Sequence, residues 1–178
     1  MSSLMDSIVD VRNLTPKTKQ ERLTEIIQHI KRVESNCNIL AQKLQETDFD
    51  FSLKLIKLGR IHDASKLEQF EFENLTGSSN LFKEALKIHH YNNPHHPEHW
   101  SGGIKQMPKI YLAEMVCDCK ARGEEFGTST RLWFHDHATE KYNFKMTDDC
   151  GVWIEHCMNL LMPPGFENIK ITYSSTPS

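Results

Sequence analysis

The chain lacks the features that would place it in a membrane or on a nucleic acid. No run among its 178 residues approaches the roughly 18 consecutive apolar residues of a membrane-spanning helix, and its first residues lack the charged-then-apolar order of a secretory signal. Its 21 lysines and arginines nearly balance its 24 aspartates and glutamates, so no broad basic face is available to bind a phosphate backbone. We therefore expect a cytoplasmic protein that binds neither a membrane nor a nucleic acid, and the sequence is compatible with an oligomer.

Paired cysteines are also missing. The five cysteines are odd in number and none is arranged as Cys-x-x-Cys, which argues against a disulfide framework. Cys117 and Cys119, which are separated by a single residue, could contribute to a soft-metal site. Buried, reduced thiols that fill the core as small apolar groups are the commoner arrangement, and this is what we expect.

Neither an internal repeat nor a domain linker interrupts the sequence, and its length suits one domain with its own core. Helical patterns cover residues 15–162. We therefore predict an all-α, single-domain helical bundle, preceded by a flexible N-terminus over residues 1–14 and followed by a C-terminal tail over residues 163–178. Within this tail, residues 169–173 could add one edge strand.

The strongest helical pattern begins at Thr15-Pro16, an N-cap followed by a first-turn proline, and continues as an apolar stripe to Leu44. Residues 47–50 resemble a capping box with aspartate in place of glutamate, and Gly123 is expected to stop the helix that begins at Met107-Pro108. Beyond the first helix, we expect helices over residues 47–62, 65–75, 80–90, 107–123, 128–142 and 147–162. Residues 92–103 form a loop that is long enough to be functional.

Histidine is abundant in this loop. Five of the ten histidines lie in the eleven residues from His89 to His99, interleaved with Asn, Pro, Glu and Trp. A purification tag or a storage tract would be terminal and low in complexity, so this internal cluster indicates a metal site. Imidazole and carboxylate ligands together suit Mn, Fe, Co, Ni or Zn.

Further candidate ligands stand outside the loop. His29 lies at the edge of the first helix's apolar stripe, the doublet His62-Asp63 ends the second helix, and Asp118 lies on a later helix. Antiparallel helices of a bundle can direct such side chains to one internal metal site. A second doublet, His135-Asp136, has no partner set in the same order, so we interpret it as a surface or structural pair. The same interpretation applies to His99, His137 and His156.

The order His29, His62-Asp63 and Asp118 resembles the HD-domain superfamily of metal-dependent phosphohydrolases. The doublet extends to His-Asp-Ala-Ser-Lys at residues 62–66, and residues 93–100 read Asn-Pro-His-His-Pro-Glu-His-Trp. With residues 85–89, 107–108 and 114–115, these motifs look like a little-characterised HD-related family of bacteria and phages, over roughly residues 25–145. Members of that family carry a tryptophan where Cys119 stands here, which is a departure at a packing position.

This resemblance implies a site for one or two divalent transition-metal ions. The first ion would be held by His29, His62, Asp63 and Asp118. Asp63 would bridge to a second ion whose candidate ligands are His89, His95 and His96, with His90 as the alternative to His89. In an enzyme with one ion, the same histidines would bind phosphate.

The function that the resemblance implies is hydrolysis of a small phosphorylated metabolite, with a nucleotide as the substrate suggested by analogy. Metal-activated water would attack phosphorus at the Asp63 site, Lys66 would hold the phosphate, and Glu98 or a spare histidine would protonate the leaving group. Trp100 and Tyr91 form either an aromatic wall for a flat group or lid packing.

Two other functions fit the same residues. An HD-fold di-iron oxygenase would use the same ligands, because imidazole and carboxylate also hold iron. A non-catalytic module that senses a nucleotide or binds a partner would keep the fold without turnover. Iron with a coupled spectroscopic signal favours the oxygenase, phosphate release dependent on Mn, Co or Ni favours the hydrolase, and bound metal without turnover favours the module.

Overall fold

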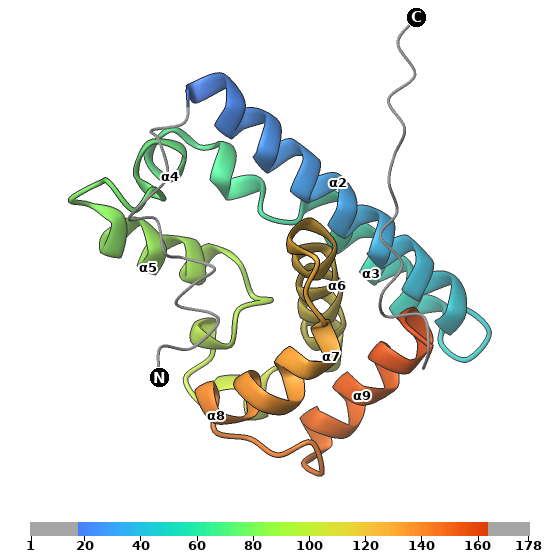
Figure 1. The fold of residues 1–178 in the computed structure, drawn as a ribbon. Helices are drawn as coiled ribbons and strands as arrows, with labels where there is room; N and C mark the ends of the chain where they lie inside the picture. Colours follow the sequence, from blue (N-terminus) through green and yellow to red (C-terminus); the bar gives the residue numbers. More distant parts are fainter. Residues whose placement is uncertain (1–17, 164–178) are drawn as a thin grey trace, which may run out of the picture.

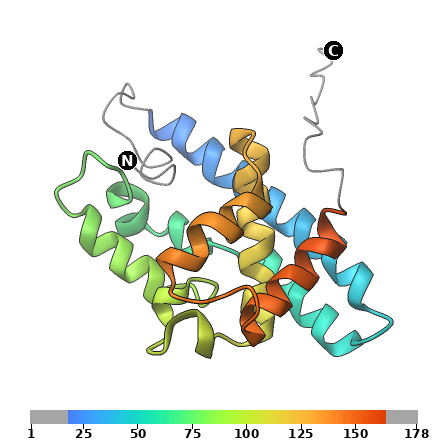
Figure 2. The same cartoon turned by 60° about the horizontal axis from the view of Figure 1, so that its bottom comes forward.

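The computed structural model describes residues 18–163, and over this range the predicted all-α class is confirmed, with no strand among the described residues (Figure 1). Helix α2 (Lys19–Leu44) and helix α3 (Phe49–Ile61) form a hairpin, and α6 (Lys109–Phe126) packs on both. Helix α9 (Asp149–Leu161) packs on α6 and α2. Figures 1 and 2 show α6 at the centre of this arrangement. The predicted edge strand at residues 169–173 lies outside the described residues.

Short elements follow and flank these four helices. A 3₁₀ turn (Ala64–Leu67) and α4 (Gln69–Asn74) follow α3, and α4 packs on α5 (Phe82–Asn92). The histidine-rich loop holds two more 3₁₀ turns, Pro97–His99 and Gly103–Gln106. The predicted helix over residues 128–142 consists of α7 (Thr130–Leu132), a π-helical turn (Trp133–Ala138) and α8 (Thr139–Lys141).

The first two helices each begin at a different cap from the one we predicted. Helix α2 begins after Thr18, whose hydroxyl accepts a hydrogen bond from the Glu21 N–H at 3.1 Å while the Glu21 carboxylate accepts one from the Thr18 N–H. The predicted cap, Thr15, lies outside the described residues. Asp48 caps helix α3, because its carboxylate accepts a hydrogen bond from the Phe51 N–H. The Thr47 hydroxyl instead donates a hydrogen bond to the Leu44 carbonyl.

The prediction that Gly123 stops α6 is wrong. The helix continues to Phe126, and Gly127 ends it in the left-handed conformation at φ 67°. Gly123 is needed for a close approach instead, since a Cβ atom there would lie 2.7 Å from the Thr130 hydroxyl and 2.8 Å from the Thr128 carbonyl. The two glycines thus have different physical roles.

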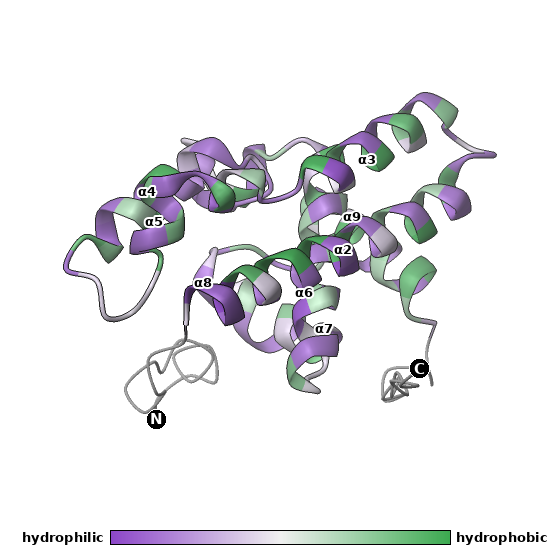
Figure 3. Ribbon diagram, turned by 90° about the horizontal axis from the view of Figure 1, so that it is seen from above, coloured by the Kyte–Doolittle hydropathy of each residue, from purple (hydrophilic) through white to green (hydrophobic). Residues whose placement is uncertain are grey.

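The core lies where α2, α3, α6 and α9 meet. Figure 3 shows the amphipathic character of these helices, with hydrophobic and hydrophilic stretches alternating along α2 and α3. All five cysteines are free, as expected, and four of them are buried. No helix within residues 18–163 has the length and apolar character needed to cross a bilayer. The largest fully buried apolar side chains are Phe134, Leu40, Leu55, Ile104, Leu112, Ile154 and Met158.

Candidate metal centre

Four predicted ligands from three parts of the chain converge beside α6. His29 comes from α2, the doublet follows the last residue of α3, and Asp118 comes from α6. His29 Nε2 lies 3.0 Å from Asp118 Oδ1 and 3.8 Å from Asp63 Oδ2. His62 Nε2 lies 3.4 Å from Asp63 Oδ2 and 3.9 Å from Asp118 Oδ1. These four side chains therefore present two imidazole nitrogens and two carboxylate oxygens to one small volume.

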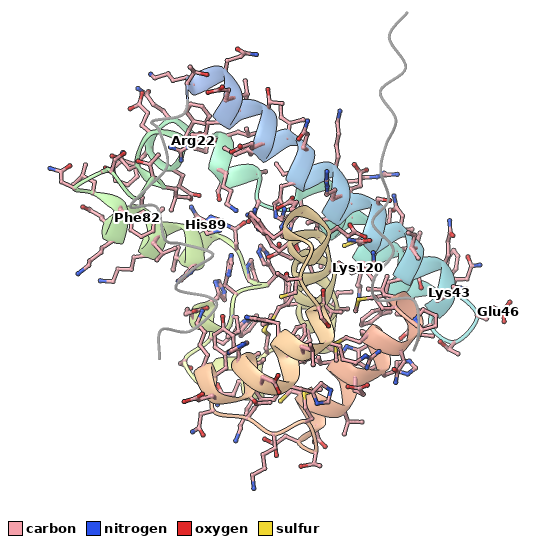
Figure 4. All side chains as sticks on the ribbon, in the orientation of Figure 1. Arg22, Lys43, Glu46, Phe82, His89 and Lys120 are labelled. Atoms are coloured by element: carbon pink, nitrogen blue, oxygen red, sulfur yellow. The ribbon has the colours of Figure 1, made fainter. Side chains whose placement is uncertain are left out.

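A second set of imidazoles faces the other oxygen of Asp63. His89 Nε2 and His95 Nε2 lie 3.3 and 3.5 Å from Asp63 Oδ1. His96 Nε2 lies 3.0 Å from His89 Nε2, and Asp63, His89 and His96 form a group of potential ligands within 4.8 Å of one another. His89 sits at the last turn of α5, and Figure 4 shows it between α5 and α6. Asp63 therefore lies between two imidazole sets.

The backbone at Asp63 is in the left-handed region, at φ 52° and ψ 21°, and the residue is 1% exposed. A residue other than glycine adopts this conformation at a cost, and such residues gather at functional sites. His62 has already left the helix, at φ −50° and ψ 129°. This break in the backbone lets two adjacent side chains face the same volume, which a regular helix would not allow.

Five atoms at this place are buried and make no hydrogen bond within residues 18–163. Leaving a buried polar atom without a partner costs about 1–3 kcal/mol, and such atoms are rare in folded proteins. Five of them pointing at one volume make this place a candidate cation site. The five atoms are Nε2 of His29, His62 and His95 and Oδ1 of Asp63 and Asp118.

Glutamates behind the imidazoles hold the rings in place. Glu125 Oε1 lies 2.9 Å from His29 Nδ1, and Glu114 Oε1 lies 3.0 Å from His62 Nδ1 and 3.4 Å from His95 Nδ1. When Nδ1–H donates to a carboxylate, the ring keeps the tautomer whose Nε2 lone pair is free for a metal. Our sequence analysis assigned no role to these glutamates. Glu114 stands four residues before Asp118 and Glu125 seven after it, so the helical period places all three on one face of α6, although it does not show that this face meets imidazoles.

Glu71 serves His89 in the same way. The Glu71 Oε2 atom lies 2.9 Å from His89 Nδ1 and accepts a hydrogen bond from the Ser65 hydroxyl at 2.8 Å. The Oε1 atom accepts a hydrogen bond from the Asn92 side chain. Glu71 is buried, and Asn93 donates to the same Ser65 hydroxyl. We see no signal in the sequence that would have singled out Glu71, because its partners lie in other elements.

Charges in the centre are strongly coupled. Burial by itself would raise the pKa of the Asp63 carboxyl, but Lys66 and His62 outweigh it and hold that pKa well below the usual range. Burial would lower the pKa of His62, yet Asp63 and Glu114 raise it well above the usual value. For His96, burial and His95 outweigh the attraction of Asp63 and lower its pKa well below the usual value. Asp63 is therefore ionised, and His96 is neutral with a lone pair available. The raised pKa of His62 means that its ring holds a proton that must leave before Nε2 can bind a metal.

The other predicted catalytic residues lie near the centre at two different depths. The Lys66 ammonium contacts Asp63 Oδ2, and its side chain is 18% exposed, so it stands between the centre and solvent. Glu98 lies farther out, 3.6 Å from the Lys141 ammonium, and forms a separate group with His90 and His96. His90 is therefore outside the group that contains Asp63, whereas His89 is inside it.

The aromatic residues of the loop differ in role. The Trp100 indole packs against Tyr111 with ring centroids 5.7 Å apart and donates to the Pro94 carbonyl, so it packs the loop onto the core. Tyr91 is 77% exposed and stands near the His99 ring. Of the two arrangements that we left open, the packing one describes Trp100.

The second doublet is remote from the centre. His135 and Asp136 are exposed, and His135 Nε2 contacts the Glu155 carboxylate at 2.9 Å. His156 packs beside Trp153, where it lines a shallow hollow that shares no residue with the centre. These positions agree with the surface or structural roles that we expected.

Comparison with known families gives one match. The model of a family described as "Family of unknown function (DUF5662)" matches residues 18–160, a range that includes every residue of the candidate centre. No curated protein and no solved structure matches the chain.

Proposed function

The chain belongs to the DUF5662 family, and since that description names no activity, we propose from the geometry of the centre that it is a two-metal phosphohydrolase acting on a small phosphorylated metabolite. The observation that carries the proposal is the division of the Asp63 carboxylate, whose Oδ2 faces His29 and His62 while Oδ1 faces His89 and His95. A carboxylate with one oxygen for each of two ions suits a centre in which the ions lie about 3.5–4 Å apart.

The residues present fit two divalent transition-metal ions. Imidazole nitrogens and carboxylate oxygens are the donors that Mn, Fe, Co, Ni and Zn accept, and the buried atoms without hydrogen bonds supply the lone pairs. His95 Nε2, 3.5 Å from Asp63 Oδ1 and 3.9 Å from Asp118 Oδ2, stands between the two positions. We assign the first ion to His29, His62, Asp63 and Asp118, and the second to Asp63, His89 and His96.

In this proposal the protein's residues have distinct tasks. Bound metal would lower the pKa of a coordinated water toward neutrality, which makes hydroxide available for attack on phosphorus. Lys66 holds Asp63 and reaches toward solvent, so its ammonium can offset charge on a phosphoryl oxygen at the mouth of the centre. Glu71, Glu114 and Glu125 keep the imidazoles oriented.

The substrate class follows from what surrounds the centre. Trp100 is committed to packing on Tyr111, so it does not provide a wall for a nucleobase. We propose a small phosphorylated metabolite as the substrate. Nucleotides come first in the screen by analogy with HD-type phosphohydrolases, because no contact of Trp100 points to a base. The helical body and the order of the ligands also support our proposal that the fold is of the HD type.

The proposal is tested on protein purified without chelator. We expect elemental analysis to find two transition-metal ions per chain, and Mn, Co or Ni to support phosphate release from members of a panel of nucleotides and other phosphomonoesters. Iron with a coupled di-iron signal and oxygen consumption, without phosphate release, would contradict hydrolysis and favour an oxygenase. Two bound ions without turnover of any compound would favour a binding module.

A further inference from the structure

A further group of metal-ligating side chains lies next to the centre, toward solvent. His90, His96 and Glu98 each place one ligand atom within 4.8 Å of those of the other two. The rings of His90 and His96 are 4.8 Å apart between centroids. His90 and Glu98 belong to neither of the sets assigned above, so an imidazole and a carboxylate stand beside His96 without a metal-binding task in the proposed centre.

His96 links this outer group to the inner one. Its Nε2 lies 3.0 Å from His89 Nε2, and it is a member both of the group with Asp63 and His89 and of the group with His90 and Glu98. An imidazole has two ring nitrogens and can rotate about its side-chain bonds, so the same residue can serve one ion position and then the other. The two groups therefore adjoin each other and share His96.

Burial rises steadily from the outer group to the inner one. Glu98 is exposed, His90 and His96 are half-buried, and His89 and Asp63 are buried at 3% and 1% exposure. A hydrated divalent ion must exchange its waters for protein ligands before it can occupy so enclosed a position. A carboxylate at the surface followed by imidazoles of increasing depth allows this exchange to proceed one ligand at a time.

We propose that His90, His96 and Glu98 form a peripheral site for a divalent transition-metal ion, from which the inner centre is loaded, with His96 passing from one ion position to the other. The part about loading rests on the proposed function, because the inner centre is the destination. The peripheral site itself does not depend on the inner one. Lys141, whose ammonium lies 3.6 Å from the Glu98 carboxylate, competes with the ion, and this contact makes the peripheral site the weaker one.

The experiment uses the full chain, stripped of metal and titrated anaerobically with Co²⁺, whose absorption reports both the number of ions and the rate of binding. Glu98→Gln and His90→Gln are compared with the wild type. His99→Gln is the matched control, because His99 lies beside Glu98 and contacts the Tyr91 carbonyl but belongs to neither group. Circular dichroism establishes that each variant is folded.

At saturating Co²⁺ we expect the wild type and His99→Gln to bind three ions per chain: the two of the inner centre and a weak third, which His90 and Glu98 hold once His96 has moved to the inner ion. Gel filtration removes the weak ion and leaves the two ions of the proposed function. Glu98→Gln and His90→Gln lose the weakest of the three and fill the inner centre more slowly by about tenfold, a change of about 1.4 kcal/mol in the barrier. The inner centre reaches the same final occupancy in all four proteins. Lys141→Met tightens the weakest site, because Glu98 loses its competing partner.

The two proposals can fail separately. If Glu98→Gln and His90→Gln bind as many ions as the wild type, at the same rate, the peripheral site is overturned while the inner centre stands. If the wild type binds a single ion that is lost in these two variants, the peripheral site stands while the inner centre of the proposed function fails. In Asp63→Asn, which removes the inner bridge, the ion that depends on Glu98 should remain.

Discussion

Helices α2 and α6 pass through two surroundings that differ sharply in chemistry. Toward α9 they contribute Cys37 and Cys117 to the apolar core, and toward α5 they contribute His29 and Asp118 to the candidate metal centre. Cys117 and Asp118 are neighbours in the sequence. Burial raises the pKa of the Cys117 thiol well above its usual value, so that side chain stays neutral. Burial would also raise the pKa of Asp118, but the His29 imidazole, 3.0 Å away, lowers it well below the usual range.

The comparison distinguishes the apolar groups that stabilise the fold from the imidazoles and carboxylates that the fold brings together. Neutral thiols and aliphatic groups stabilise the molecule simply by leaving water. Imidazoles and carboxylates at the other end cost stability, because buried atoms stay without hydrogen bonds until a cation satisfies them. The apolar half therefore stabilises the fold by itself, whereas in our proposal the centre would become favourable only with metal bound.

The largest effect is expected from Asp63→Asn, which breaks the centre at the residue shared by both ions. Asparagine has the same size and tolerates the left-handed backbone, so the change removes charge without reshaping the chain. We expect loss of both ions and a fall in phosphate release of about a thousandfold, or roughly 4 kcal/mol. Elemental analysis and phosphate assays measure both. Asp136→Asn, at an exposed aspartate, is the control, and full activity in Asp63→Asn would remove the metal from the mechanism.

Leu40→Ala tests the other half of the comparison on the helix that also carries His29. Leu40 is fully buried in the core, so its truncation leaves a cavity and lowers the free energy of unfolding by about 2–5 kcal/mol. Chemical denaturation measures this loss. The number of ions per folded chain should not change. Ile39→Ala, at an exposed neighbour, is the control and should lower the free energy of unfolding by less than about 1 kcal/mol. Loss of the ions in folded Leu40→Ala would mean that the apolar core and the centre are not separable.

Glu114→Gln sharpens the comparison at the boundary of the centre. The glutamine keeps the shape but weakens the contacts that orient His62 and His95. Metal affinity should fall by about 10–100-fold, as competition with a chelator measures. Glu124→Gln is the matched control on the same helix, because Glu124 pairs with Lys120 at the surface. Equal affinities in the two variants would show that Glu114 has no part in metal binding.

The smallest of these effects is expected from Lys66→Ala. This change leaves every assigned ligand in place, so both ions should remain, while turnover falls by about tenfold with the loss of one charged group near the phosphoryl oxygens. Steady-state kinetics on metal-loaded protein measures the change. Lys57→Ala, at an exposed lysine of α3, is the control. Unchanged kinetics would reduce Lys66 to a surface charge.

The sequence predicts the helices well where one local pattern decides them. Helix α2 ends at Leu44, which is also the last residue of the predicted apolar stripe. Gly123 and Gly127 could not be told apart, since one glycine is required by the approach of Thr128 and Thr130 and the other by a left-handed turn. The π-helical turn at Trp133–Ala138 has no pattern of its own in the sequence.

For the centre, the sequence predicted the side chains that now face one another but not those behind them. His29, the doublet and Asp118 could be found because their order along the chain resembles a known superfamily. Glu71 and Glu114 resemble ordinary helical glutamates until the structure places them against His89 and His62. Whether a glutamate meets solvent or an imidazole depends on which helices pack together, and no local pattern contains that information.

The most direct measurement is a crystal structure of Mn²⁺-loaded protein with anomalous diffraction. The account predicts two anomalous peaks about 3.5–4 Å apart, one against each oxygen of Asp63, with His29 and His62 at the first and His89 at the second. A single peak that Asp63 does not contact, or peaks bound by cysteine sulfur in the apolar half, would contradict it.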